Sequence, residues 1–261
     1  MKTVRATLLM FTAVFGSLLL FLTAPGCARV AESKAETAVN NLLPSFLGPA
    51  DKYTTHVRGN SVGAVMRGRL ESVHIEGQNV HLQDGMTIDR LQMDFEAISL
   101  DTQAQKLTHV GSAKFAARIG TANLNRYVTV KRPTLSGLLI TLGEGTATVE
   151  ARPAMLARFG IDALKIPISV RGRLAPADNG TKLDFVPDGA HVSVLPIPRP
   201  VIDYLARTLN PAVDFSVLPI PIQIQSAQIR PDGVYLEGIA PPEDLLQAAN
   251  KAILPTPTPG P

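Results

Sequence analysis

Few residues of this chain have the type and spacing that catalysis needs, and Ser61 is the most suggestive. The stretch "GNSVG", Gly59 to Gly63, matches the G-x-S-x-G pattern of a nucleophile elbow. Such an elbow needs a strand before it and a true helix behind it, in a mostly parallel sheet. Here "AVMRGRLESV" follows, broken by Gly68 and soon alternating. A glycine-rich turn explains the pattern better, and a serine hydrolase using Ser61 stays a remote alternative.

The histidines and acids predict neither a metal site nor acid–base chemistry. No histidine forms H-x-x-x-H or pairs with a cysteine; the five are His56, His74, His81, His109 and His191. The acids of "IDRLQMDFEAISLD" mostly oppose an apolar strand face, as is typical of a solvated surface. The chain has no Walker loop and no dinucleotide fingerprint. We therefore expect a protein that is not an enzyme and has no cofactor and no metal.

The charge of the chain does not favour a nucleic-acid partner. The formal charge is +3, and two of these units come from Lys2 and Arg5 near the start. No run of five or more basic residues follows, so the electrostatic signature of phosphate-backbone binding is missing. Hydrophobic residues make up 45% of the chain while aromatics are 5% and Trp is absent, so the apolar mass is mostly aliphatic.

The N-terminus predicts export. "MKTVRATLLMFTAVFGSLLLFLTAPGC" has a basic start, an apolar run from about Leu8 to Ala24, and then small residues. The only cysteine, Cys27, ends this stretch, and the layout resembles a lipoprotein signal in which Cys27 is acylated. Ordinary cleavage, for example after Ala28, and an uncleaved apolar anchor are the alternatives. All three place the rest of the chain outside the cytoplasm, and the first and third attach it to a membrane.

The remaining chain reads as one antiparallel α+β domain over residues 28–245. An amphipathic helix is expected at 29–47, and from about residue 53 the apolar period changes to two. Four turn pairs predict hairpins: Asp84-Gly85, Asn179-Gly180, Asp188-Gly189 and Asp232-Gly233. Further helices are expected at 121–130 with Thr121 as N-cap, at 199–209, and at 241–254. Residues 246–261 comprise the end of this last helix and a proline-rich tail that we expect to be disordered.

The order of these segments resembles a known family. "VRGNSVGAVMRGRLESVHIEGQNVHLQDGMTIDRLQMDFEAISLD", "IGTANLNRYV" and "LNPAVDFSVLPIPIQIQSAQIRPDGVYLEG" carry the resemblance, which covers roughly residues 35–240. The chain resembles the LmeA-like phospholipid-binding family of secreted or envelope-anchored bacterial proteins. The resemblance implies a tubular lipid-binding fold of the BPI-like type, with a strongly curved antiparallel sheet wrapped around a long N-terminal helix. It also implies an apolar cavity that holds acyl chains, and no catalytic constellation.

Two copies of "LPIP", at Leu195–Pro198 and Leu218–Pro221, stand in the most apolar part of the chain. Proline removes a ladder donor, so it is mostly confined to sheet edges, strand starts and bulges. If the sheet curls, these segments border an opening. The expected apolar wall consists of Leu42, Leu43, Phe46, Leu195, Ile197, Leu205, Leu218, Ile220, Ile222 and Ile224. At ~0.8 kcal/mol per buried CH₂, a 16-carbon chain offers on the order of 10 kcal/mol before ordering costs.

The expected function is extracytoplasmic phospholipid binding, with lipid carriage or support of envelope glycolipid assembly. The head-group candidates are Arg126, Arg199 and Arg207, beside the predicted helices. The main alternative is a structural or scaffolding envelope protein whose aliphatic faces pack a closed core.

Overall fold

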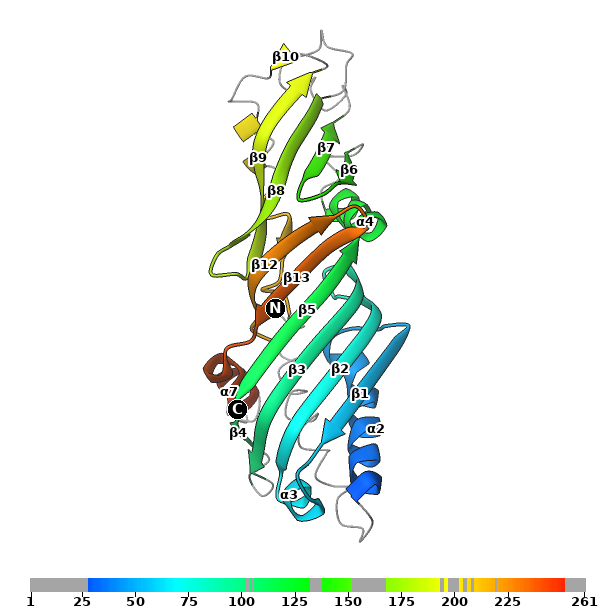
Figure 1. Cartoon of the computed structure of the whole chain (residues 1–261), viewed down its shortest axis with the longest axis vertical. Coiled ribbons are helices and arrows are strands. Elements are labelled where there is room, and N and C mark those ends of the chain that lie inside the picture. Colours follow the sequence, from blue (N-terminus) through cyan, green and yellow to red (C-terminus); the bar gives the residue numbers. More distant parts are fainter. Residues whose placement is uncertain are drawn as a thin grey trace, which may run out of the picture.

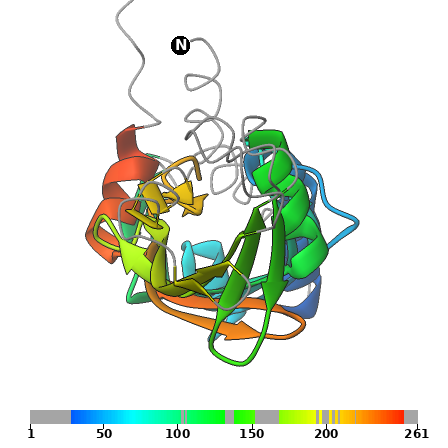
Figure 2. The ribbon, with the colours of Figure 1, turned by 90° about the horizontal axis from the view of Figure 1, so that it is seen from above.

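The computed structural model describes residues 28–101, 104, 106–131, 138–151, 168–192, 195–196, 202–203, 206–207, 209–218 and 220–251. Within these ranges the chain forms two antiparallel sheets that follow one another along an elongated molecule (Figure 1). Seen along the long axis, the strands curl into an incomplete ring (Figure 2). The expectation of a mostly antiparallel, curved sheet is therefore confirmed.

The large sheet has seven strands in the order β1-β2-β3-β5-β13-β12, with β4 paired to β3. Alternation over the middle of β3 buries one face, as the period of two predicted: Leu91, Met93 and Phe95 are buried while their neighbours are not. The strands are β1 Lys52–Arg58, β2 Arg69–His81, β3 Thr87–Asp101, β4 Lys106–His109, β5 Ser112–Gly120, β12 Gln223–Arg230 and β13 Gly233–Ile239.

The small sheet has six strands in the order β10-β9-β8-β7-β6, with β11 paired to β9. Its strands are β6 Leu139–Leu142, β7 Ala147–Ala151, β8 Ile168–Ala177, β9 Lys182–Val192, β10 Leu195–Pro196 and β11 Val213–Asp214. Pro196 lies in the terminal strand β10, and Pro221 lies just before β12, the terminal strand of the large sheet. Pro196 is thus in an edge strand, as expected, while Pro221 lies outside a strand and Pro198 and Pro219 lie outside the described residues.

Three of the four predicted turns are present and one is not. Gly85 and Gly180 have φ of +91° and +79°, which only glycine adopts without strain, and Asp232 lies in the turn between β12 and β13. The hairpin expected at Asp188-Gly189 is wrong, because this pair lies inside β9. There the register shifts, with Gly189 opposite Arg171 and Pro187 opposite Gly172. Asp188 is the extra residue of a β-bulge, another conformation that such a pair accommodates.

Helices α2 Ala28–Phe46, α4 Thr121–Lys131 and α7 Pro242–Lys251 agree with the sequence in position, and the described residues between 202 and 209 are also helical. The short helix α3 Val62–Met66 is not predicted by the sequence, because the pattern around Ser61 favours a glycine-rich turn. Thr121 is not the expected N-cap, because its hydroxyl has no hydrogen-bond partner. Instead Asp89 of β3 accepts the Gly120 N–H at 2.6 Å. Among the described helices, none is long and apolar enough to cross a membrane.

Helix α2 lies along the edge strand β1, and a sheet wrapped around this helix is not shown (Figures 1 and 2). Three acceptors on one side of α2 take hydrogen bonds from that edge: Glu32 from the Gly59 N–H at 3.2 Å, Glu36 from the Val57 N–H at 3.0 Å, and Asn40 from the Thr55 hydroxyl at 2.7 Å. We call these three contacts the edge clamp. Four helical residues rise about 6 Å and two strand residues about 6.7 Å, so the two ladders match.

Two other helices cover edges in the same way. Asn125 of α4 accepts the Ile140 N–H of β6 at 2.7 Å and donates to the Ile140 carbonyl at 2.8 Å. Asn250 of α7 donates to the Leu107 carbonyl of β4 at 3.1 Å. Polar side chains on helices therefore satisfy backbone groups at three strand edges, which would otherwise be open to another chain.

Candidate functional site

The buried face of the large sheet is a continuous apolar surface. One row of paired residues crosses five strands as Ile75, Met93, Phe115, Gly238 and Ile224. The row beside it, over the same five strands, runs Gly77, Leu91, Ala117, Leu236 and Ala227. Each row therefore sets glycine or alanine between large aliphatic or aromatic side chains.

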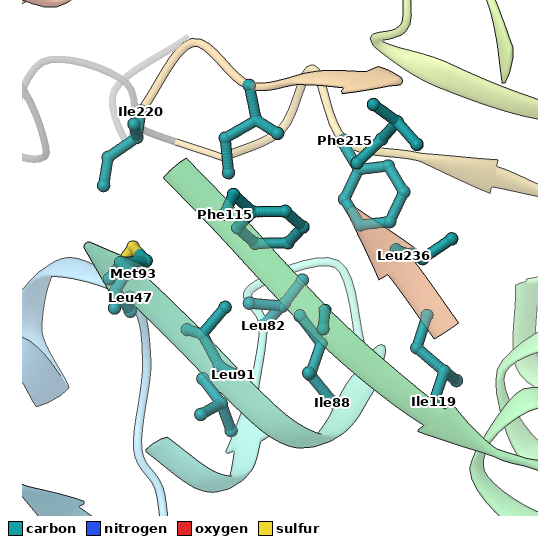
Figure 3. Packing of buried hydrophobic residues seen from close by; sticks show 14 of the residues in the cluster. Leu47, Leu82, Ile88, Leu91, Met93, Phe115, Ile119, Phe215, Ile220 and Leu236 are labelled. Atoms are coloured by element: carbon teal, nitrogen blue, oxygen red, sulfur yellow. The ribbon is translucent and has the colours of Figure 1, made fainter. Parts of the chain in front are cut away.

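The segment after the small sheet packs over this face. Phe215 meets Phe115 edge to face, with ring centroids 6.3 Å apart and planes at 68° (Figure 3). Ile220 belongs to the same cluster and is 4% exposed. This segment is held in place by Asn210, which accepts the Phe185 N–H at 2.7 Å and donates to the Phe185 carbonyl at 3.1 Å.

The structure brings part of the predicted wall together. Leu43, Ile220, Ile222 and Ile224 are buried in one cluster, and Leu218 packs against it. The side chains of Leu42, Phe46, Leu195, Ile197 and Leu205 lie outside the described residues. Whether any of these side chains contacts a lipid stays a prediction.

Charge is missing from the described interior. Its buried polar residues are two threonines, Thr55 and Thr87, and the Thr55 hydroxyl is used by the edge clamp. A charged group transferred to such an environment would lose its hydration without compensation. The described interior is therefore apolar, and a phosphate or ammonium group would have to stay where water reaches it.

The structure describes two of the three head-group candidates, Arg126 and Arg207. Arg126 is exposed on α4, and Arg207 is exposed with its Nε donating to the Asp203 carbonyl at 3.2 Å. Neither makes an ion pair with a described residue. Arg199 lies outside the described residues. The described structure thus gives no shared anion site for these arginines.

The outer face of the large sheet carries a polar cluster around His74. A groove of about 390 Å³ there is lined by residues that include Ser72, His74 and Asp94. Asp94 bonds to Nδ1 of His74, and Glu76 lies 3.3 Å from Nε2. The hydrogen bond to Asp94, opposed by partial desolvation and helped by Glu76, raises the pKa of His74. Both ring nitrogens face carboxylates, so His74 has none left to deprotonate Ser72.

Ser61 has a structural role in the fold. Its hydroxyl accepts the Ala64 N–H at 3.1 Å and so caps the short helix α3. A nucleophile needs a base within hydrogen-bond reach, and among the described residues no histidine is bonded to this hydroxyl. Within the same residues no group of three or more His, Cys, Asp or Glu side chains could hold a metal ion.

The edge clamp was missed by sequence reasoning. Its signal is the series Glu32, Glu36 and Asn40, which places acceptors at every fourth residue of α2. Such a series is also typical of an exposed helix face, so it points to a strand edge only when the strand is known to lie beside it.

Of three comparisons with known proteins, one finds a match. Neither the curated proteins nor the solved structures include a match to this chain. A family model described as LmeA-like phospholipid-binding matches residues 26–239, which include both sheets and the buried apolar face of the large sheet. The chain therefore belongs to the LmeA-like phospholipid-binding family.

Proposed function

We propose that this protein binds phospholipid outside the cytoplasm, with the acyl chains held against the buried face of the large sheet. The observation that carries the proposal is the character of that face, whose described buried residues are aliphatic or aromatic apart from two threonines. Membership of a phospholipid-binding family supports the same ligand class. Residues 28–245 would act as one tubular lipid-binding unit.

The dimensions of the sheet suit an acyl chain. Strand β3 has 15 residues, which at ~3.3 Å each gives a length of about 50 Å. The hydrocarbon core of a bilayer is about 30 Å thick, so one leaflet's chains span about 15 Å. A chain lying along the sheet gains ~0.8 kcal/mol per buried CH₂, so affinity does not require a charged contact. Head-group selectivity would then rest on residues at the rim, with Arg126, Arg199 and Arg207 as candidates.

The N-terminal segment supplies the membrane connection in this proposal. Acylation of Cys27, or retention of the apolar run before it, would hold the lipid-binding unit at the outer side of the membrane. From there it could carry lipid or supply it to envelope glycolipid assembly. If Cys27 is acylated, Cys27→Ala should move the protein from the membrane fraction to the soluble fraction of cells. Unchanged membrane association would favour the uncleaved anchor.

The first test is native mass spectrometry of the protein released from membranes without detergent. We expect extra mass that matches one or two phospholipids per chain and disappears on denaturation. A bare mass, together with no extraction of labelled lipid from vesicles, would support the alternative of a scaffold with a closed core.

A pair of variants on one strand tests the wall itself. Replacing Ile222 and Ile224 by Asp places charge on the apolar face and should abolish lipid retention. Gln225→Asp is the matched control, because Gln225 directly follows Ile224 and is exposed. Circular dichroism reports whether each variant folds. A folded double variant that retains lipid would show that these residues do not line the lipid site.

A further inference from the structure

One segment of the chain combines exposed arginines with apolar residues and contains no acid. Residues 58–69, "RGNSVGAVMRGR", include Arg58, Arg67 and Arg69 and no Asp or Glu. All three arginines are exposed, and none makes an ion pair with a described residue. We call residues 58–69 the tip segment.

The tip segment is a shaped turn built around α3. Val65 is buried at 2% exposure and packs against Gly59, where a Cβ atom would come within 2.0 Å of the valine Cγ2. Val62 and Ala64 remain half-buried on the same short helix. The guanidinium of Arg67 lies over Gly63, since a Cβ there would be 3.3 Å from Nη1. The turn thus places partly exposed apolar residues next to a cation.

The tip segment lies where the chain enters the fold. The Gly59 N–H donates to Glu32 in the first turns of α2, and α3 contacts α2. Figure 1 shows α3 at the end of the large sheet beside the start of α2, with α4 at the opposite end. Residues 1–27, which contain the apolar run, therefore join the described structure at this end.

We propose that the tip segment docks on a lipid surface that carries anionic head groups. This inference rests on the proposed function, in which the N-terminal segment holds the protein at a membrane. Each basic residue near an anionic surface strengthens association by roughly fivefold, so three together favour the docked state by about a hundredfold. Val62 and Ala64 would enter the interfacial region while the arginine stems extend their charges to the phosphates.

Nearby acids offset part of this charge. Glu71 is exposed two residues beyond Arg69, and Arg58 lines the groove on the outer face of the large sheet together with Asp94 and Glu96. Glu32 accepts the Gly59 N–H and keeps its own charge. Within residues 58–71 the three arginines still outnumber the single acid by two, so the tip segment remains basic.

The absence of tryptophan from the sequence makes a direct test possible. Val62→Trp introduces a single tryptophan at the tip segment, and Asn60→Trp places one at an exposed neighbouring position in case the first variant does not fold. Val130→Trp is the control, because Val130 is 66% exposed on α4 at the other end of the large sheet. The full chain is reconstituted in vesicles of phosphatidylcholine, or of equimolar phosphatidylcholine and phosphatidylglycerol, with brominated acyl chains as quencher.

Docking predicts a blue-shifted, strongly quenched emission for Val62→Trp in the anionic vesicles and weak quenching in the neutral ones. The control should show weak quenching in both. Replacing Arg58, Arg67 and Arg69 by Gln in the Val62→Trp chain should reduce the anionic signal to the neutral level, as should high salt. Equal quenching at the tip segment and at position 130, or quenching that the three Gln substitutions leave unchanged, would overturn the proposal.

Measuring lipid retention by native mass spectrometry distinguishes a failure of the docking proposal from a failure of the proposed function. A chain that retains phospholipid but shows no tip quenching refutes docking alone. A chain that docks but never retains lipid refutes the lipid-binding function and leaves the membrane contact in place.

Discussion

The edge clamp makes a quantitative prediction about stability. In Glu36→Ala the Val57 N–H loses a carboxylate acceptor at 3.0 Å. A hydrogen bond to a charged group contributes about 1.5–3 kcal/mol net, and the better helix propensity of Ala returns about 0.4 kcal/mol. We therefore expect the free energy of unfolding to fall by about 1–2.5 kcal/mol. Glu36→Gln keeps an acceptor oxygen without its charge, so its loss should be smaller.

Urea unfolding and amide exchange together test this prediction. The m-value should stay constant while the midpoint falls, because the variant removes a bond without changing the surface that unfolding exposes. Exchange at the Val57 amide should become faster. The His56 amide is an internal reference. The Val57 N–H points away from β2, towards α2, and successive N–H groups of an antiparallel strand point to opposite sides, so the His56 N–H points towards β2 and does not contact Glu36.

Asn41→Ala is the matched control for this pair of measurements. Asn41 is exposed on α2, next to Asn40 but outside the clamp, and its replacement should leave stability within about 0.5 kcal/mol of the parent chain. If Glu36→Ala and Asn41→Ala unfold at the same urea concentration, the carboxylate contributes nothing and the reasoning about the edge is refuted. Unchanged Val57 exchange in Glu36→Ala would refute it as well.

Three other predictions follow from single side chains. The folded-state pKa of His74 is raised above 6.5, chiefly by Asp94. The protonated histidine therefore stabilises the fold below pH 6.5, and this stabilisation is lost as the pH rises through the folded-state pKa. Urea unfolding at several pH values should show the loss in the parent chain and not in Asp94→Asn. Ser61→Ala removes the cap of α3 and should cost about 1 kcal/mol of stability, whereas labelling of the parent by a serine-reactive phosphonate at Ser61 would contradict its structural role. Gly238→Ala would place a Cβ atom 2.3 Å from the Gln223 carbonyl oxygen. The thermal unfolding midpoint of this variant should therefore fall clearly below that of the parent chain. An unchanged midpoint would show that β12 moves freely at this point.

The sequence predicted the elements of this fold better than their mutual positions. The period of two in β3 identified its buried face, and the spacing of apolar residues in α2 identified a helix that buries Ala35, Val39 and Leu43. These patterns work because each is set by the geometry of a single element. They say that a face is buried, and they do not say what covers it.

The position of α2 could not be predicted for this reason. A helix with an apolar stripe fits equally well inside a curved sheet or along its edge. The choice is made by Glu32, Glu36 and Asn40, whose oxygens satisfy β1, and these contacts depend on a match between two different repeat lengths. The same limit applies to Asp188-Gly189, where a turn and a bulge use the same residue types.

The candidate site was predictable in part. The aliphatic pattern of Ile220, Ile222 and Ile224 predicts that they are buried, and they lie in one buried cluster with Leu43. Their contact with a lipid stays a prediction. The role of Asn210 was not visible, because nothing in its neighbourhood reveals that it bonds to both backbone groups of Phe185. Long-range contacts of a single polar side chain leave no periodic signal.

The edge clamp also has a mechanical consequence. Its three bonds are spaced along the axis of α2 and lie side by side with β1. Tension applied to the chain at Ala28 along the helix axis would shear all three contacts at once, whereas a force across the axis would peel them one at a time. Shearing requires the bonds to break together, so resistance is greatest along α2. Helix α2 can therefore transmit a pull from the preceding segment into the whole large sheet without unravelling its edge.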